Sequence, residues 1–243
     1  MVEIQRIVAP NPGPMTLDGT NTYVLGGEVV VDPGPADVEH VERLVDLAPR
    51  LILVTHKHTD HTEAARELAR STGAVLRGLD ADQCHGGAPL VDGEWIPVGD
   101  AELQILATPG HTHDSICIVV PGRAVLTGDT ILGRGTTVIM HPDGAIAPYL
   151  ASLDKLEALG DLEVLPGHGD PLPSVAAIAR QYRAHRLERL EQVRQALRDL
   201  GSSAADATVG DVVDRVYPDL DDDVRFAAEA STAAQLSYLA EVG

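Results

Sequence analysis

The chain is poor in aromatic residues and cysteine and has no long apolar run. Aromatic residues make up 3% of the 243 residues, with one Trp and one Phe, so few side chains are available for stacking single-stranded bases. Cys84 and Cys117 are the only cysteines and lie far apart, which argues against a disulfide scaffold or a cysteine-ligated zinc site and is typical of a reducing compartment. No run is long enough to span a bilayer, and the N-terminus has no apolar secretory core. We therefore expect a cytoplasmic protein that does not enter a membrane.

Basic residues are also few. The sequence has 18 Lys and Arg against 37 Asp and Glu, giving a formal net charge of −19. A field of this sign repels polyanions and disfavours general nucleic-acid binding, although a local cationic site built from metal ions remains compatible with it. The length suits one large domain with a substantial core, or one domain with a small appendage.

Histidine, by contrast, is concentrated in one stretch. The apolar run 51–54 predicts a buried strand, and His56, His58, Asp60 and His61 follow it directly. Imidazole and carboxylate are the ligands that borderline divalent metals prefer. In an extended His-x-His the side chains of His56 and His58 point to the same side and can share one ion, while Asp60 and His61 are offset towards a second. The alternative is a polar loop whose histidines only form hydrogen bonds. Four potential ligands within six residues favour a metal site over that alternative.

Three further residues of the same types follow short strand-like runs. They are His111 in Thr-Pro-Gly-His, Asp129 in Leu-Thr-Gly-Asp and His168 in Leu-Pro-Gly-His. Taken singly, each is as easily a turn residue as a ligand. Their occurrence in this order after the histidine motif makes a set of unrelated turns improbable.

The four motifs together resemble the signature of the metallo-β-lactamase superfamily. The resemblance implies an α/β (α+β) chain folded as an αββα sandwich, with His56, His58 and His111 holding one metal and Asp60, His61 and His168 holding the other. Asp129 would bridge the two metals, and Asp60 would orient a metal-bridging hydroxide and receive its proton. Zinc fits this ligand set best, and manganese or iron can also occupy such sites.

Other segments resemble the superfamily branch of lactamase-β-like protein 2. The resemblance rests on three segments, Asn11-Pro-Gly-Pro, Gly19-Thr-Asn21-Thr and Gly128-Asp-Thr-Ile-Leu-Gly-Arg-Gly-Thr. On this resemblance Asn21, Thr22 and Arg134 are expected to line the substrate pocket.

Composition changes after Pro173, where a helical region is predicted. Ser174 is the expected N-cap of a long helix that ends at Gly201. Its expected apolar stripe consists of Leu187, Leu190, Val193, Leu197 and Leu200. Two more helices are expected after Thr208 and after Asp221. We divide the chain into a metallo-β-lactamase-like metal-binding domain, 1–173, and a small C-terminal helical domain, 174–243, which the branch resemblance implies to be winged-helix-like.

These observations predict a binuclear metal-dependent hydrolase. Its expected substrate is a small thioester or ester, as in glyoxalase II, and a cationic metal site in an acidic protein suits an anionic or carbonyl-bearing molecule. A single-strand-specific endoribonuclease of the lactamase-β-like protein 2 type is the alternative enzyme, which the net charge disfavours. A non-catalytic regulatory or partner-binding module is the alternative from another class. The sequence leaves open whether the chain forms a homodimer.

Overall fold

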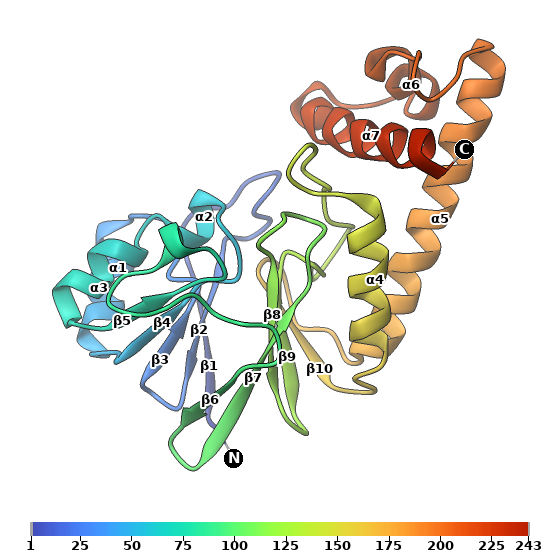
Figure 1. Cartoon of the computed structure of the whole chain (residues 1–243). Coiled ribbons are helices and arrows are strands. Elements are labelled where there is room, and N and C mark those ends of the chain that lie inside the picture. The colour runs from blue at the N-terminus through green and yellow to red at the C-terminus, as the bar shows by residue number, and fades with distance from the viewer. Residues whose placement is uncertain (1, 243) are drawn as a thin grey trace.

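Two five-stranded sheets pack face to face in the computed structural model, which describes residues 2–242. Helices cover the outer face of each sheet, so the layers follow the order helices, sheet, sheet, helices (Figure 1). This arrangement is the αββα sandwich that the superfamily resemblance implied.

The first sheet has the strand order β1-β2-β3-β4-β5. Its strands are β1 (Ile4–Val8), β2 (Asn21–Leu25), β3 (Val29–Val31), β4 (Leu51–Leu53) and β5 (Val75–Arg77). The first three are antiparallel, and β3, β4 and β5 are parallel. Strands β2 and β3 form a hairpin, and both turn glycines, Gly26 and Gly27, have positive φ angles.

The second sheet has the order β10-β9-β8-β7-β6. Its strands are β6 (Trp95–Val98), β7 (Ala101–Ala107), β8 (Ile116–Val120), β9 (Ala124–Gly128) and β10 (Glu163–Pro166). Neighbours from β6 to β9 are antiparallel, and β10 is parallel to β9. Consequently β7, β9 and β10 all run in one direction, and their carboxyl ends lie at one edge of the sheet.

The helices divide between the two outer faces and the C-terminal tail. They are α1 (Val38–Asp46), α2 (Thr59–Thr62), α3 (Ala65–Thr72), α4 (Ile146–Glu157), α5 (Val175–Leu200), α6 (Val209–Val216) and α7 (Asp222–Val242), with a 3₁₀ turn at Ala81–Gln83. The first three lie beside the first sheet, and α4 and α5 lie beside the second (Figure 1). Gly73 ends α3 in the left-handed conformation, and the short helix α2 before it includes Asp60 and His61.

Successive side chains of each strand point to opposite faces of the sheet, so one apolar run contributes to two separate cores. In β4, Leu51 and Leu53 enter the cluster between the sheets, whereas Ile52 packs in the cluster beneath α1 and α3. In β8, Ile116 and Ile118 face the first sheet and Cys117 faces the α4 side. Because successive side chains point to opposite faces, strands covered on both sides need continuous apolar runs.

The tail consists of α5, α6 and α7, and residues 174–242 contain no strand that could form a wing. Ser174 caps α5 by accepting from the backbone of Ala177, and Gly201 ends it in the left-handed conformation, as predicted. One apolar cluster includes side chains from β8, β9 and all three tail helices. The division at residue 173, which we retain as a proposal, therefore does not separate two independent cores.

The apolar stripe predicted for α5 is correct at its centre and wrong at Leu187 and Leu200. Leu190, Val193 and Leu197 are buried, but Leu187 is 41% exposed and Leu200 is 38% exposed. At 3.6 residues per turn, Leu187 lies about 60° around the axis from Leu190, away from the packed face. Arg186 takes an inward position instead and is 3% exposed.

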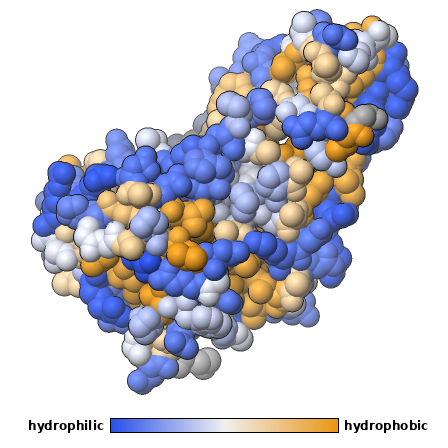
Figure 2. Space-filling view, viewed as in Figure 1, coloured by the Kyte–Doolittle hydropathy of each residue, from blue (hydrophilic) through white to orange (hydrophobic). Residues whose placement is uncertain are grey.

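The surface agrees with the acidic, polar composition. Figure 2 shows hydrophilic side chains over much of the α1–α3 side and apolar side chains between the tail helices. Within residues 2–242, no helix has both the length and the apolar character required to cross a bilayer.

The packing of α5 predicts different outcomes for two neighbouring leucines. Leu190→Ala should reduce the free energy of unfolding by about 2–5 kcal/mol, because it opens a cavity in the shared cluster. Leu187→Ala removes the same atoms from an exposed position and should change it by about 0.5 kcal/mol or less. Urea unfolding of both variants measures the difference, and equal losses would contradict this packing of the tail.

Candidate metal centre

The seven side chains predicted to be ligands converge at the carboxyl ends of β4, β7, β9 and β10. They form two groups, in each of which the candidate ligand atoms lie within 4.8 Å of one another. The first group is His56, His58, His111 and Asp129, and the second is Asp60, His61 and His168. The backbone N–H of Asn21 donates to the carbonyl oxygen of Gly167 at 2.7 Å, which joins the two sheets at this edge.

The first group is a cluster of imidazole nitrogens. His58 Nδ1 lies 3.0 Å from His56 Nε2 and 3.0 Å from His111 Nε2. Both His56 and His111 are buried, and His58 is partly exposed. Three nitrogens converging on one point provide a site for a cation.

The second group combines two imidazoles with a carboxylate. His61 Nε2 and His168 Nε2 are 3.1 Å apart, and Asp60 Oδ2 lies 3.1 Å from His168 Nε2. Asp60 and His61 reach this group because α2 turns them away from the extended His56 to His58 segment. The offset expected between the two pairs is therefore present.

Asp129 lies between the groups. Its Oδ1 is 3.4 Å from His61 Nε2 and 3.5 Å from His168 Nε2, whereas its Oδ2 is 3.7 Å from His111 Nε2. Oδ1 is buried without a hydrogen-bond partner, a costly condition for a carboxylate oxygen unless a cation accompanies it. A donor set of imidazoles and carboxylates around such an atom fits borderline divalent metal ions.

Hydrogen bonds on the far sides of the rings orient four of the histidines. His61 Nδ1 donates to Asp32 Oδ2 at 2.9 Å, His111 Nδ1 to the Val138 carbonyl at 2.5 Å, and His168 Nδ1 to the Gly19 carbonyl at 3.2 Å. His56 Nδ1 lies 3.1 Å from Thr55 Oγ1. These contacts leave each Nε2 facing the centre, which is how ligand histidines are normally held.

Asp32 supports both groups, and the motif analysis gave it no role. Its Oδ2 accepts from His61 Nδ1 and also, at 2.7 Å, from Thr55 Oγ1, the hydroxyl next to His56. It is buried and has a φ of 50°, an uncommon conformation for a residue other than glycine. The available signal was its position directly after the apolar strand β3, which repeats the pattern of strands followed by a candidate ligand.

Burial and the carboxylates shift the pKa values in opposite directions. Burial lowers the pKa of His111 to about 4 and that of His56 well below its usual range. Burial also disfavours charge on His168, but Asp129 and Asp60 outweigh it and raise its pKa to about 9. Burial would raise the pKa of Asp129, yet His168 and His61 hold it well below its usual range.

Gly167, directly before the candidate ligand His168, allows the strand end to approach the centre. A Cβ at this position would lie 2.6 Å from Asp129 Oδ1 and 2.8 Å from His61 Cε1. Any larger residue in the Pro-Gly-His motif would therefore displace a proposed ligand.

A cavity of about 480 Å³ opens over the two groups. Its lining residues are Met15, Lys57, His58, Thr59, Asp60, His111, Asp129, Met140 and Phe226. Sequence motifs alone did not single out Met15, Lys57, Met140 or Phe226, because these residues come from separate segments and match no ligand pattern.

The residues expected to bind substrate are not among those lining this cavity. Asn21 is buried and donates to the carbonyls of Pro166 and Gly169, so it holds the loop that contains His168. Thr22 is buried and donates to the Asp32 carbonyl at 2.7 Å. Arg134 is exposed, with its guanidinium 3.5 Å from Asp18.

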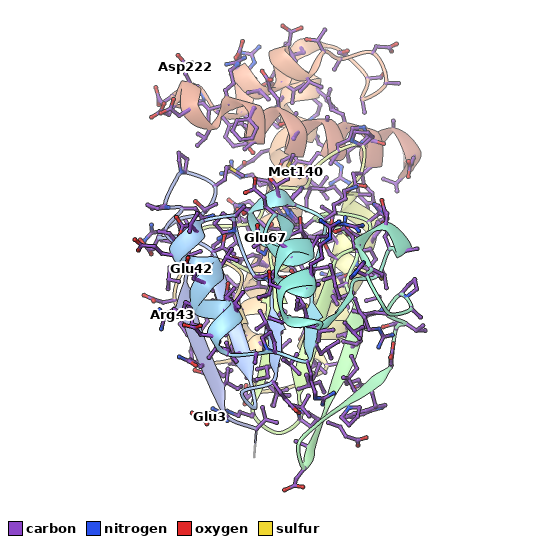
Figure 3. All side chains as sticks on the ribbon, turned by 90° about the vertical axis from the view of Figure 1, so that its left-hand side faces the viewer. Glu3, Glu42, Arg43, Glu67, Met140 and Asp222 are labelled. Carbon is purple, nitrogen blue, oxygen red and sulfur yellow. The ribbon has the colours of Figure 1, made fainter. Side chains whose placement is uncertain are left out.

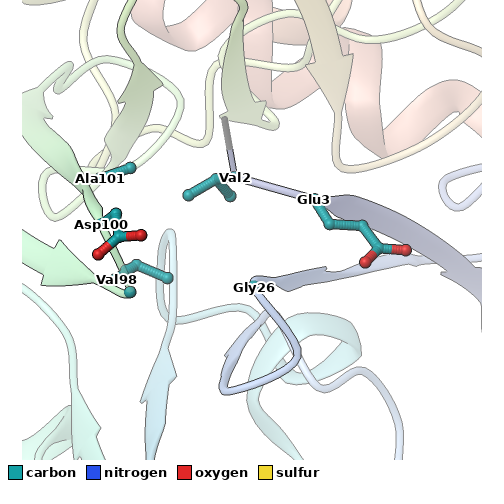
Figure 4. A pocket seen from close by; sticks show the side chains of 7 residues that line it. Val2, Glu3, Gly26, Val98, Asp100 and Ala101 are labelled. Carbon is teal, nitrogen blue, oxygen red and sulfur yellow. The ribbon is translucent and has the colours of Figure 1, made fainter.

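Two other features lie outside the centre. His113 is paired with Asp80 at 2.8 Å and with Asp143 at 2.5 Å, and Lys57 also contacts Asp143. A separate hollow of about 160 Å³ lies where β1 begins beside the β6–β7 turn, with Glu3 and Asp100 at its sides (Figure 4). Its described lining contains no cluster of metal-ligand side chains.

Comparison with known proteins places these features in a family. The metallo-beta-lactamase superfamily domain matches residues 15–168. A beta-lactamase-like protein 2 homolog from Caenorhabditis elegans is 31% identical over 99% of this chain and 85% of its own length. An atrochrysone carboxyl ACP thioesterase from Aspergillus fumigatus is 31% identical over 91% of this chain and 75% of its own length.

Two further comparisons concern length and fold. A lactamase-like protein from Pestalotiopsis microspora is 33% identical over 68% of this chain, and the match spans only 53% of that protein. The solved structure of a metallo-beta-lactamase family protein from Thermus thermophilus has a TM-score of 0.82 at 23% identity, covering 99% of this chain and 94% of that one. The matched domain, the relatives and the fold agree, and the chain belongs to the metallo-beta-lactamase superfamily of hydrolases.

Proposed function

We propose that the centre binds two divalent metal ions, with zinc the metal that best fits the donor set. His56, His58 and His111 would hold one ion, and Asp60, His61 and His168 the other. The observation that carries the proposal is the position of Asp129, whose two carboxylate oxygens face different groups. When bound, such a pair of ions lowers the pKa of water towards ~7 and stabilises negative charge on a substrate oxygen.

We propose that the reaction is hydrolysis of a small thioester or ester. Asp60 lines the cavity and would hold the attacking water and receive its proton. The water oxygen forms a bond to the acyl carbon, the bond from that carbon to sulfur or oxygen breaks, and the leaving group takes up a proton. The products are a carboxylic acid and a thiol or alcohol.

Cavity size and surface charge favour a small substrate over RNA. A volume of about 480 Å³ lies within the usual range for small-molecule sites. The arginines that repeat along α5 offer little free positive charge, because Arg180 pairs with Glu157, Arg183 pairs with Asp154, and Arg186 is buried. Thioesterases among the relatives are consistent with this choice, and endoribonuclease activity remains the second candidate because of the beta-lactamase-like protein 2 relative.

Metal analysis tests the centre directly. Protein purified without chelators should carry about two divalent ions per chain, and His56→Ala and His168→Ala should each reduce that occupancy by weakening a different group. His85→Ala is the matched control, because His85 is exposed and outside both groups. Wild-type protein that cannot be loaded with metal would support the non-catalytic module instead.

Acidification should release the two metals in sequence. Ligand imidazoles must be neutral, so protons compete with metal. The pKa of His168 is raised to about 9, and that of His111 is lowered to about 4. Affinity of the second group should therefore fall as the pH decreases below ~9, whereas the first group should retain metal to lower pH. Titration with a metal-sensitive dye at several pH values measures this order, and the reverse order would contradict it.

Asp60→Asn should lower kcat far more than it raises KM, because the amide cannot receive the proton of the attacking water. We expect a loss in kcat of about 100-fold or more. Asp80→Asn makes the same chemical change at a carboxylate that pairs with His113 outside the centre and should have little effect. Metal content must be measured for both variants, and equal losses in kcat at equal metal content would exclude this role for Asp60.

Parallel assays on an acyl thioester and on single-stranded RNA decide between the two substrates. The metal-loaded protein should hydrolyse the thioester, and Asp129→Asn should abolish that turnover. RNA cleavage, if present, should weaken steeply with salt because few cationic contacts support it. RNA cleavage that disappears in Asp129→Asn, with no thioester turnover in the wild type, would establish the endoribonuclease.

A further inference from the structure

The cavity over the metal centre is lined by the one Phe and by two of the three Met of this chain. The sequence has one Phe and three Met, and Phe226, Met15 and Met140 all line this cavity. Met15 lies in the segment before β2, Met140 in the segment between β9 and α4, and Phe226 in helix α7. Figure 3 labels Met140 at the level where the tail helices meet the rest of the molecule.

These side chains are incompletely covered in the protein alone. Phe226 is 50% exposed and Met15 is 36% exposed. A single exposed apolar residue is ordinary on a protein surface. Three that converge on one concave site from separate segments form an apolar wall whose burial by a ligand would be favourable.

The rest of the lining of the same cavity is polar. His58, Asp60, His111 and Asp129 line it, and Lys57 lies beside them with its ammonium 2.6 Å from Asp143. A ligand filling the whole cavity therefore needs a polar, electron-rich group at one end and an apolar group at the other. An acyl derivative has this division, with its carbonyl adjoining an apolar chain or ring.

The tail holds the apolar wall in place. The backbone N–H of Ile139 donates to Ser231 Oγ at 3.2 Å, which fixes the segment before Met140 against the helix that contains Phe226. Arg186 of α5 donates to the Thr137 carbonyl. Thr137 Oγ1 in turn lies 3.2 Å from His111 Nδ1. The same segment thus contacts a proposed metal ligand and contributes to the wall.

We propose that Met15, Met140 and Phe226 form an acyl-binding site, which selects thioesters or esters with a bulky apolar acyl group over short ones. The inference rests on the proposed hydrolase function and adds the class of acyl group. Unbranched thioether side chains adapt to ligands of different shape, and both sulfur and the Phe226 ring form favourable contacts with apolar and aromatic groups. Helix α7 therefore contributes a specificity-determining residue to a site whose metal ligands all precede it in the chain.

The test compares acetyl, octanoyl and benzoyl thioesters of N-acetylcysteamine. For wild-type protein, kcat/KM should be higher for octanoyl and benzoyl than for acetyl. In Phe226→Ala, the ratio of the octanoyl or benzoyl value to the acetyl value should fall by about 10-fold. Met140→Ala should lower the ratio in the same direction. Val242→Ala, an exposed apolar residue near the end of the same helix, is the control and should leave the ratio unchanged.

A second measurement separates this inference from the proposed function. Calorimetry of the metal-loaded protein with octanoate, benzoate and acetate, the product acids, should show tighter binding of the first two and a loss of that preference in Phe226→Ala. Turnover of all thioesters at an unaltered ratio in Phe226→Ala would overturn the acyl-binding site and leave the hydrolase intact. Absence of turnover with a preference that depends on Phe226 would retain the site and refute the hydrolase. If Phe226→Ala abolishes RNA cleavage and the wild-type protein shows no acyl preference, the apolar wall would instead contact a nucleotide base. That result would overturn the inference.

Discussion

The structure depends on the electrostatic balance between buried imidazoles and the carboxylate of Asp129. In the first group, burial lowers the pKa of the histidines and so disfavours their charged form. In the second group, Asp129, Asp60 and Asp32 raise the pKa of the histidines. Bringing these groups together without a compensating cation costs free energy, because each polar atom loses water. The surrounding sandwich must supply that free energy, and continuous apolar strands buried on both faces are its source.

Asp32 links the scaffold to the centre, because its hydrogen bonds help to orient the histidine rings. One buried carboxylate contacts His61 directly and reaches His56 through the Thr55 hydroxyl. Its left-handed backbone conformation is tolerated because β3 and β4 fix the residues before it and beside it. The two groups consequently share a support outside the ligand set, in addition to the Asp129 carboxylate between them.

The sequence predicted the parts of this molecule that depend on local patterns. The strands and the caps of α5 at Ser174 and Gly201 follow from periodicity and turn chemistry, and the convergence of the ligand types is what the superfamily resemblance implied. Long-range placement was beyond it. Phe226 reaches the cavity only because α7 returns over the centre, and Asn21 and Thr22 turn inwards only because the loop after β10 and the end of β3 require their hydrogen bonds. No local signal distinguishes a side chain that contacts substrate from one that holds a loop.

The proposed metal ligands and the apolar wall of the cavity belong to separate parts of the chain. Every proposed ligand precedes position 169, whereas Phe226 belongs to a helix that follows by more than fifty residues. Replacement of one residue on α7 therefore changes the shape of the cavity without altering a ligand motif. Homologous chains with the same ligand motifs can therefore differ in substrate specificity. Retention of the metal-ligand residues does not by itself determine which substrate a related protein binds.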